Sequence, residues 1–593
     1  MIIGRIKDHL EYFRHYIIPF KRKFILILLM ILIISLLSLT PPLFLKYLLD
    51  NVLLSKNYSG LILVITAFFL IQLIGGAIKA VMEYWHEYVG AWMIFKIRDD
   101  LFRHLQTLSV NFFMHNKQGD ILTRLTGDIT SIHSIISIVL TSTLPDVTQI
   151  IGIIGILSLL NWQLTLLSLV VVPLFFFTQS YFGKKIKKLA RITRERNADI
   201  TVQLLEVFNN IPIVKIFNTH EYEAARHERK STSYINSTLK MHIVKFLSVF
   251  LITMITTISV LIVIGYGGYL VMNGLLTIGS FVAFYTYVIK VFVPLKRVVN
   301  YNVSVYSSLA SVDRVKEFLS VKPDIVDVEN PVELKSVKGK ITFSNVSYAH
   351  QGSNNSPKKE NVLNNISFEI LPGEHVALVG KTGAGKTTII NLLCRLFYPQ
   401  SGTIKIDDTD IRTVSADSLY KNIAIVPQND MLFNEPVEDN VRYGNKSTSD
   451  SFVNNYIKAV GLDRIIESME EKIKTSIGPQ GSKLSGGERK ILMIARALVK
   501  NTSILIFDEA TTAVDTNTES KILKNLDDLL KDKTVITIAH RISTIVEADK
   551  ILLLNQGSIA GFGTHAELLN TNEFYKSLFY NRSSSLSSEY SYV

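Results

Sequence analysis

The sequence predicts an all-α domain of six transmembrane helices followed by an α/β domain with a phosphate-binding loop. The mean hydropathy of +0.27, with 48% hydrophobic and only 19% charged residues, is too high for a purely soluble chain of this size. The long apolar stretches lie in the first half, whereas short β-branched strands alternate with helices from Gly339 to about Phe579. The single cysteine, Cys394, excludes an internal disulfide framework.

Six stretches have the length of about 20 mostly apolar residues that a membrane-spanning helix requires. They run over residues 24–45, 61–82, 140–160, 164–182, 246–271 and 278–295. Pro41, Pro42, Pro145 and Pro173 lie within or beside these stretches. Membrane helices tolerate proline where neighbouring helices supply hydrogen-bond donors to the freed carbonyls, so the prolines do not argue against the spans.

The connections between the spans alternate in length and charge. Residues 83–139 and 183–245 form long polar loops rich in Lys and Arg, and Lys21, Arg22 and Lys23 precede the first span. The positive-inside rule therefore places these loops and both termini in the cytoplasm. The richness in Ile, Lys and Asn suits an AT-rich genome, so we expect a bacterial inner (cytoplasmic) membrane. The long loops have a helical pattern, so we expect spans two to five to continue into the cytoplasm as helices.

The strongest local motif is a phosphate-binding loop of the form G-x-x-x-x-G-K-[ST]. It follows a strand at 375–379 and opens a helix at 388–396. Its glycines allow backbone N–H groups to surround phosphates at a helix N-terminus. Lys386 is expected to contact the β- and γ-phosphates, and Thr387 to ligate Mg²⁺. The predicted nucleotide-binding residues here are Gly380, Lys381, Thr382, Gly383, Ala384, Gly385, Lys386, Thr387 and Thr388.

A second apolar strand, residues 504–507, ends in the paired acids Asp508 and Glu509. Carboxylates at the end of a buried strand are costly unless they have a function. Beside a phosphate loop, Asp508 is expected to hold Mg²⁺ through water and Glu509 to polarise the attacking water. The alternative is that the two acids cap the next helix.

Residues 484–488, LSGGE, resemble the signature motif of ABC ATPases, which distinguishes that family from other phosphate-loop proteins. Gln428 in IVPQND resembles the family's Q-loop, residues 512–515 its D-loop, and His540 its switch histidine. The resemblance implies the ABC exporter architecture, with ATP and Mg²⁺ as cofactors. It implies catalytic roles for Glu509, His540 and Gln428, and Mg²⁺ binding by Thr387, Gln428 and Asp508.

This resemblance divides the chain into five regions. They are an amphipathic elbow at 1–23, the transmembrane domain at 24–305, a linker at 306–338, the ATP-binding domain at 339–580 and a disordered tail at 581–593. Residues 111–128 and 208–223 resemble the family's two intracellular loops, which carry the short helices that couple the two domains.

The chain departs from the family pattern at two places. The adenine-stacking position is occupied by His350 in VSYAH, so either His350 or Tyr348 is expected to stack on the base. Residues 475–481, TSIGPQG, lack the charged pair that often precedes the signature motif, so the coupling to the membrane domain differs in detail.

The resemblance also implies a dimer, in which two ATP molecules lie between two nucleotide domains. Ser485, Gly486 and Gly487 would bind the γ-phosphate held by the phosphate loop of the other copy. Because one chain carries one of each motif, and all are intact, a homodimer is expected; a heterodimer with a degenerate partner stays open.

The mechanism implied is ATP-driven export or flipping by alternating access. Lys79, Lys290, Lys296 and Arg297 lie toward the cytoplasmic side and would line a basic cavity for an amphipathic, lipid-like and anionic substrate. The alternative is that these side chains reach the inner interface. A drug or peptide exporter is the second candidate function, and an importer or ATP-gated channel the third. The net charge of +12 fits the cytoplasmic loops, and no aromatic-basic motif indicates a nucleic-acid partner.

Overall fold

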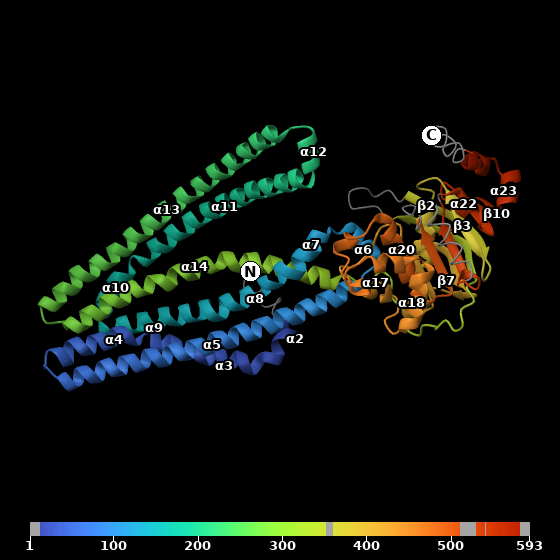
Figure 1. Cartoon of the computed structure of the whole chain (residues 1–593). Coiled ribbons are helices and arrows are strands. Elements are labelled where there is room, and N and C mark those ends of the chain that lie inside the picture. Colours follow the sequence, from blue (N-terminus) through green and yellow to red (C-terminus); the bar gives the residue numbers. More distant parts are fainter. Residues whose placement is uncertain (1–11, 351–359, 510–528, 540, 581–593) are drawn as a thin grey trace. The chain divides into compact units, whose positions relative to one another are not determined.

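The computed structural model describes residues 12–350, 360–509, 529–539 and 541–580. The chain divides into two compact units (Figure 1). The first contains residues 1–106 and 119–321, and the second contains residues 107–118 and 322–593. The short segment 107–118 therefore leaves the membrane half of the sequence and folds with the α/β half.

The secondary structure of the described residues of the first unit is all helical, and six helical segments among them are long and apolar enough to cross a membrane, as the sequence predicts. These segments are Arg14–Leu53, Tyr58–Thr107, Thr141–Leu160, Trp162–Asn209, His220–Met272 and Ile278–Val298. The helices are α2 (Arg14–Ile17), α3 (Lys21–Ser38), α4 (Thr40–Tyr47), α5 (Tyr58–Thr107), α7 (Gln118–Thr123), α8 (Ile129–Ser137), α9 (Leu144–Leu160), α10 (Trp162–Leu169), α11 (Val172–Asn209), α12 (Ile211–Ile216), α13 (His220–Met272) and α14 (Ile278–Ser320).

Several helices run far beyond the bilayer, as the helical pattern of the loops predicts. At a rise of about 1.5 Å per residue, the 53 residues of α13 span roughly 80 Å, against about 30 Å of hydrocarbon. Helices α11 and α13 form an antiparallel pair joined by α12 (Figure 1). The length in excess of the hydrocarbon agrees with the expectation that these spans continue as helices.

Helix α14 does not end with the sixth span, which shortens the linker expected at 306–338. It continues to Ser320, so residues 306–320 are helical and the connection begins at Val321. The reason is a three-residue spacing of apolar side chains that are all buried, typical of an amphipathic helix. These are Leu309, Val312, Val315 and Phe318.

The prolines at the start of α4 show how the first unit satisfies freed carbonyls. Thr40 Oγ1 donates to the Leu37 carbonyl at 2.8 Å, and Lys290 Nζ donates to the Ser38 carbonyl at 3.0 Å. These oxygens would otherwise pair with the amides that the prolines lack. Lys290, from the sixth span, thus has a structural contact that the sequence does not reveal.

The other basic residues of the expected cavity have different surroundings. Lys79 lies 3.7 Å from Glu83 on the same helix, and both side chains are exposed. Arg297 donates to Asp146 at 2.9 Å, and this carboxylate is buried. Lys296 is exposed. The charge of Arg297 is therefore neutralised within the chain, which leaves Lys290 and Lys296 as the basic groups available to a ligand.

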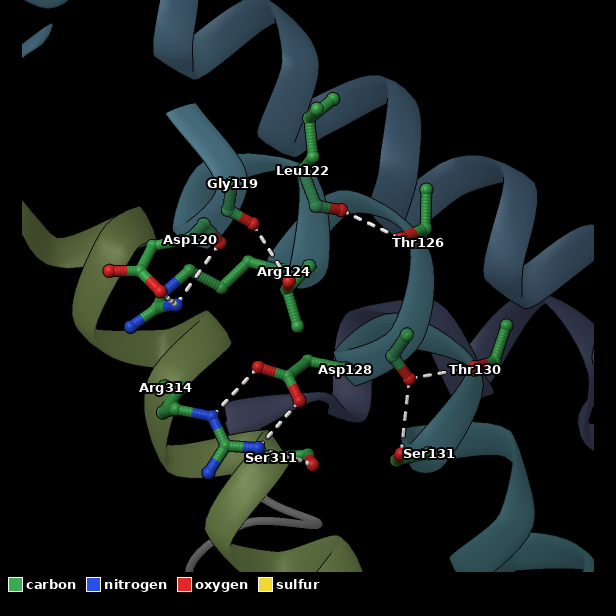
Figure 2. Close-up of polar contacts among 12 residues, drawn as sticks. Gly119, Asp120, Leu122, Arg124, Thr126, Asp128, Thr130, Ser131, Ser311 and Arg314 are labelled. Atoms are coloured by element: carbon green, nitrogen blue, oxygen red, sulfur yellow. Dashed lines mark hydrogen bonds and ion pairs between the residues drawn. The ribbon is translucent and has the colours of Figure 1, made fainter. Parts of the chain in front are cut away.

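A second ion pair with a buried carboxylate joins η3 (Arg124–Asp128) to the end of α14 (Figure 2). Arg314 donates to both oxygens of Asp128, at 2.8 and 2.6 Å, and to the hydroxyl of Ser311 at 2.9 Å. Asp128 is 4% exposed. The hydrogen bonds from Arg314 hold the pKa of the Asp128 carboxyl below its ordinary value. Arg124 lies nearby with its guanidinium 4.5 Å from the Phe318 ring.

We predict that Asp128→Asn destabilises the first unit. Its folded-state pKa is lowered, so the carboxylate stabilises the fold above its unfolded pKa of about 4, and this contribution is lost as pH falls through the folded pKa. At neutral pH the free energy of unfolding of the variant should be lower by about 1.5–3 kcal/mol, the range for a hydrogen bond to a charged group. Thermal unfolding of the detergent-solubilised chain measures this; equal midpoints for Asp128→Asn and the wild type at neutral pH would contradict it.

The second unit contains two sheets. The antiparallel sheet has the order β2-β1-β4-β5, and the other sheet has the order β10-β9-β3-β8-β7-β6, with β6 to β9 and β3 parallel. The strands are β1 (Ile341–His350), β2 (Glu360–Ile370), β3 (His375–Gly380), β4 (Ser401–Ile406), β5 (Thr409–Asp410), β6 (Ile423–Val426), β7 (Ile504–Asp508), β8 (Thr534–Ile538), β9 (Lys550–Asn555) and β10 (Ser558–Gly563).

Helices complete the α/β layering of this unit (Figure 1). They are α6 (Val110–His115), α15 (Lys386–Leu393), α16 (Ala416–Asn422), α17 (Val437–Arg442), α18 (Asp450–Ala459), α19 (Leu462–Glu467), α20 (Gly486–Val499), α22 (Ile542–Val546) and α23 (His565–Thr571). The expected α/β domain is confirmed. Since β3, β8, β7 and β6 are parallel neighbours, their carboxyl ends meet at one edge of the sheet, where ligands bind in such folds.

Candidate nucleotide-binding site

The phosphate-loop motif connects β3 to α15, as predicted. Gly383 and Gly385 adopt positive φ angles of 82° and 100°. A Cβ on Gly385 would lie 2.6 Å from a methyl group of Leu363. Glycine is therefore required at this position both by the backbone conformation and by the close approach of β2. The loop leads directly into the N-terminus of α15, where backbone N–H groups can bind phosphate.

Lys386 begins α15 and is buried beneath this loop. Its ammonium group donates to the carbonyls of Gly380 and Lys381, each at 3.0 Å. Thr387 is exposed in the same turn, whereas Thr388 is buried. Lys386 thus lies inside the loop that is expected to hold the phosphates, and the exposed Thr387 is accessible to a cation.

The paired acids lie where β7 ends, two strands from β3. Asp508 is 6% exposed, and burial together with the charge of Glu509 raises the pKa of its carboxyl. Glu509 has a φ of 50°, in the left-handed region, and its carboxylate accepts a hydrogen bond from Gln428 Nε2 at 2.9 Å. Gln428 follows β6, so three residues of the prediction converge on the carboxyl edge of the sheet. Direct contact between Gln428 and Glu509 disfavours the alternative in which the acids only cap a helix.

The signature motif forms the exposed N-terminus of α20. Ser485 is the N-cap, and its hydroxyl accepts from the Glu488 amide at 3.3 Å. The Glu488 carboxylate accepts from the Ser485 amide at 2.7 Å, which completes a capping box. Gly486 and Gly487 form the first turn of α20, so their amides point along the helix toward its positive end.

Three residues that sequence reasoning did not identify connect this helix to the Gln428 segment. Arg489 donates to Asp430 at 2.7 Å and to the Leu484 carbonyl at 2.8 Å. Lys490 is buried and donates to the backbone carbonyls of Pro427 and Gln428. The sequence gives no signal for this role of Lys490, because a buried lysine on α20 cannot be told from an exposed one in the sequence pattern. The network fixes the backbone beside Gln428 relative to Ser485.

Tyr348, one of two residues expected to stack on adenine, belongs to the core of the antiparallel sheet. It is 8% exposed, and its ring lies 5.5 Å from that of Phe397 at 27°. It also lines a cavity of about 250 Å³ together with Ala349, Tyr398 and Gln400. The side chain of His350 is outside the described part of the structure.

The short α6 segment lies beside the same cavity. Ser109 donates to the Asp324 carboxylate at 2.8 Å, and Ser109, Asn111 and Asp324 contribute to the cavity lining. This is the contact with the nucleotide domain expected of the first intracellular loop. The corresponding helix of the second loop, α12, has exposed apolar side chains.

Two predicted elements of the site fall outside the described residues, namely His540 and the segment 512–515. The tail predicted at 581–593 and the first eleven residues of the predicted elbow also lie outside them. β8, which precedes His540 in the chain, is described and lies between β3 and β7. The described residues suffice for a nucleotide site with cation ligands. They provide a positively charged loop for phosphates, a buried carboxylate for a cation and a second carboxylate in contact with an amide.

Two family models match the chain. A model described as "ABC transporter transmembrane region" matches residues 24–295, and one described as "ABC transporter" matches residues 363–512. One match lies in the first half of the sequence and the other in the second, so the resemblance seen in the motifs extends to both halves.

Several relatives match over nearly the whole chain. An ATP-dependent lipid A-core flippase of Syntrophus aciditrophicus is 34% identical over 94% of this chain and 92% of its own length. A Bacillus subtilis protein provisionally described as a multidrug export ATP-binding/permease protein is 32% identical over 97% of this chain and 99% of its own. The solved structure of a bacterial Atm1-family ABC exporter with ATP bound has a TM-score of 0.79 at 28% identity, covering 95% of this chain and 98% of that one.

Proposed function

This chain belongs to the ABC transporter family as a multi-pass membrane protein that couples ATP hydrolysis to export, and we propose that two copies work together to flip an amphipathic, lipid-like substrate by alternating access. In this proposal the membrane is the bacterial cytoplasmic membrane, and both termini face the cytoplasm. One polypeptide contains both the spans and a nucleotide domain, so each copy supplies half of the transmembrane region and one of the two nucleotide domains.

The observation that carries the proposal is the packing of segment 107–118 in the α/β unit. Ser109 and Asn111 come from the sequence between the second and third spans, yet they line the cavity beside Tyr348. A movement of the nucleotide domain is thereby transmitted to the helices on either side of this segment. The hydrogen bond that Ser109 donates to the Asp324 carboxylate supports the same coupling.

We assign roles to the site residues as follows. Lys386 holds the β- and γ-phosphates of ATP; Thr387, Gln428 and Asp508 hold Mg²⁺, which neutralises phosphate charge when bound. Glu509 polarises the attacking water, with Gln428 orienting its carboxylate and His540 assisting. The remaining nucleotide contacts come from the loop residues Gly380 to Thr388, from Tyr348 or His350 at the base, and from the signature residues.

Two features of the chain support a homodimer. The N-terminus of α20 at Ser485 is exposed, and a phosphate there would complete an anion site. At α12, where the helices α11 and α13 are joined, the side chains of Ile213, Ile216 and Phe217 are 54%, 79% and 72% exposed. Apolar side chains grouped at a helix far from the hydrocarbon indicate a protein surface that they cover.

The names of the relatives support a lipid-like substrate for this chain, with multidrug export as the second candidate. ATPase measurements in nanodiscs against lipids, peptides and drugs test both, together with the movement of a fluorescent lipid between leaflets. Stimulation by lipids with ATP-dependent flipping is the expected result. Stimulation by drugs or peptides alone would replace the proposal with the second candidate, and passive flux without coupled turnover would indicate a channel.

Lys290→Met tests whether the substrate is anionic. Lys290 is half-buried and donates to the Ser38 carbonyl, which leaves two of its N–H groups for an anion. We expect the variant to lose the stimulation by anionic lipids while it keeps basal turnover. Lys79→Met, which removes an exposed lysine paired with Glu83, is the matched control and should behave as the wild type. Equal anionic stimulation in both variants would exclude the basic cavity.

A further inference from the structure

A cluster of two histidines and a glutamate lies outside the nucleotide site, and we propose that it binds a divalent transition-metal ion. His86 and Glu87 are on α5, and His133 is on α8. One ligand atom from each of these residues lies within 4.8 Å of the others. The two imidazole rings are 5.2 Å apart, centre to centre. The site joins two helices that are separated in sequence, and it is independent of the proposed transport function.

The two imidazoles present nitrogen atoms that have no other partner. Nε2 of His86 and Nε2 of His133 are both buried and make no hydrogen bond. His86 as a whole is 6% exposed, and its Nδ1 lies 3.5 Å from the Glu87 carboxylate. Buried polar atoms nearly always have a partner, because desolvation without one is costly. A metal ion would supply such a partner, and the Glu87 carboxylate lies within 4.8 Å of one nitrogen of each ring.

Gly90, one turn after His86, allows this arrangement. A Cβ at this position would lie 1.9 Å from Nε2 of His133. The imidazole therefore rests against the backbone of α5, which only glycine permits without a shift of the ring. Gly90 is itself buried in the helix interface. The missing side chain of Gly90 thus allows His133 to lie against α5, although Gly90 is not itself a ligand.

The position along α5 places the cluster at the membrane surface. His86 is roughly 40 Å from the start of the helix at Tyr58, which exceeds the hydrocarbon thickness of about 30 Å. Tyr88 beside it contacts Lys23 at 3.8 Å from its ring centre, and the ring of Trp85 lies 5.7 Å away. Such aromatic residues gather at the membrane–water boundary. The Glu87 side chain is 74% exposed, so an ion can enter from water.

The donor set defines the class of ion. Two imidazoles and one carboxylate suit Zn²⁺, Co²⁺ or Ni²⁺, with water at the remaining positions, whereas Mg²⁺ and Ca²⁺ prefer oxygen ligands. The ligand atoms of a tetrahedral Zn²⁺ lie roughly 3.4 Å apart, so the spacing of up to 4.8 Å must shorten by up to about 1.4 Å. Rotation of the exposed Glu87 supplies part of that movement. The bound ion would fasten α5 to α8.

Cobalt binding to the full-length protein tests the site. The protein, in nanodiscs and without a polyhistidine tag, is stripped with chelator and titrated with Co²⁺, then with Zn²⁺ in competition. We expect one Co²⁺ per chain, with visible d–d absorption that Zn²⁺ displaces. His86→Gln or His133→Gln should weaken binding by at least about tenfold, since even an outer-shell partner contributes that much. Gly90→Ala should also weaken it, although it removes no ligand.

His220→Gln is the matched control. His220 lies 3.8 Å from Glu221 in an exposed pair without a second histidine, and its loss should leave metal binding unchanged. Wild-type affinity in the His86→Gln, His133→Gln double variant would overturn the proposal. Where a variant fails to fold, X-ray absorption of the Zn²⁺-loaded wild type decides: scattering from two imidazoles supports the site, and its absence refutes it.

Discussion

Glu509→Gln is expected to abolish ATP turnover while the protein still binds ATP. The amide keeps the shape of the side chain but cannot polarise water, and the loss of a general base lowers turnover by roughly 100- to 10,000-fold. The phosphate contacts of Lys386 and the loop do not involve Glu509, so affinity is retained. Steady-state phosphate release and retention of labelled ATP measure the two properties on the same sample.

The local structure sharpens this prediction. Gln428 Nε2 donates to the Glu509 carboxylate, so a glutamine at 509 can still accept that hydrogen bond through its amide oxygen. The variant should therefore fold as the wild type and accumulate in an ATP-bound closed dimer. Glu470→Gln, an exposed carboxylate on the same domain, is the control and should turn over normally. Near-wild-type turnover in Glu509→Gln would show that another residue acts as the base.

The predictable parts of this molecule are those that short-range patterns encode. The six spans follow from composition over about 20 residues, and the phosphate loop, the paired acids and the capped signature helix each follow from a few adjacent residues. The sheet then brings Gln428 and Glu509 together, because parallel strands end at the same edge.

The contacts that sequence reasoning missed join positions far apart in the chain. Lys290 donates to the Ser38 carbonyl, 252 residues away in the chain, whereas the sequence predicts Lys290 only as a residue of the basic cavity. Lys490 pairs with backbone carbonyls near Gln428, 62 positions away, and no periodic pattern marks a buried lysine. Residues 306–320 are expected to belong to a linker, yet they form the end of α14, because charged residues stand between the buried apolar residues that repeat every three positions.

A mixed dimer should reveal whether each ATP site is built from two chains. In the proposed arrangement, the loop with Lys386 faces Ser485 of the other copy. Lys386→Ala and Ser485→Arg are each expected to be inactive as homodimers, because every site loses either its phosphate lysine or its signature serine. When the two variants pair, both defects fall in one site, and the other site joins an intact loop to an intact signature motif.

Co-expression with two different tags isolates the mixed dimer, whose ATPase rate is then compared with that of both homodimers. Recovery of turnover at one site is the expected outcome. The reciprocal pairing is the control: a wild-type chain with a chain that carries both substitutions has one defect in each composite site and should stay inactive. If each site were contained within one chain, the pattern would reverse, with the control active and the mixed variants inactive. Ser485 lies at an exposed helix N-terminus, so arginine there obstructs the phosphate; it removes one capping hydrogen bond but leaves the buried face of α20 unchanged.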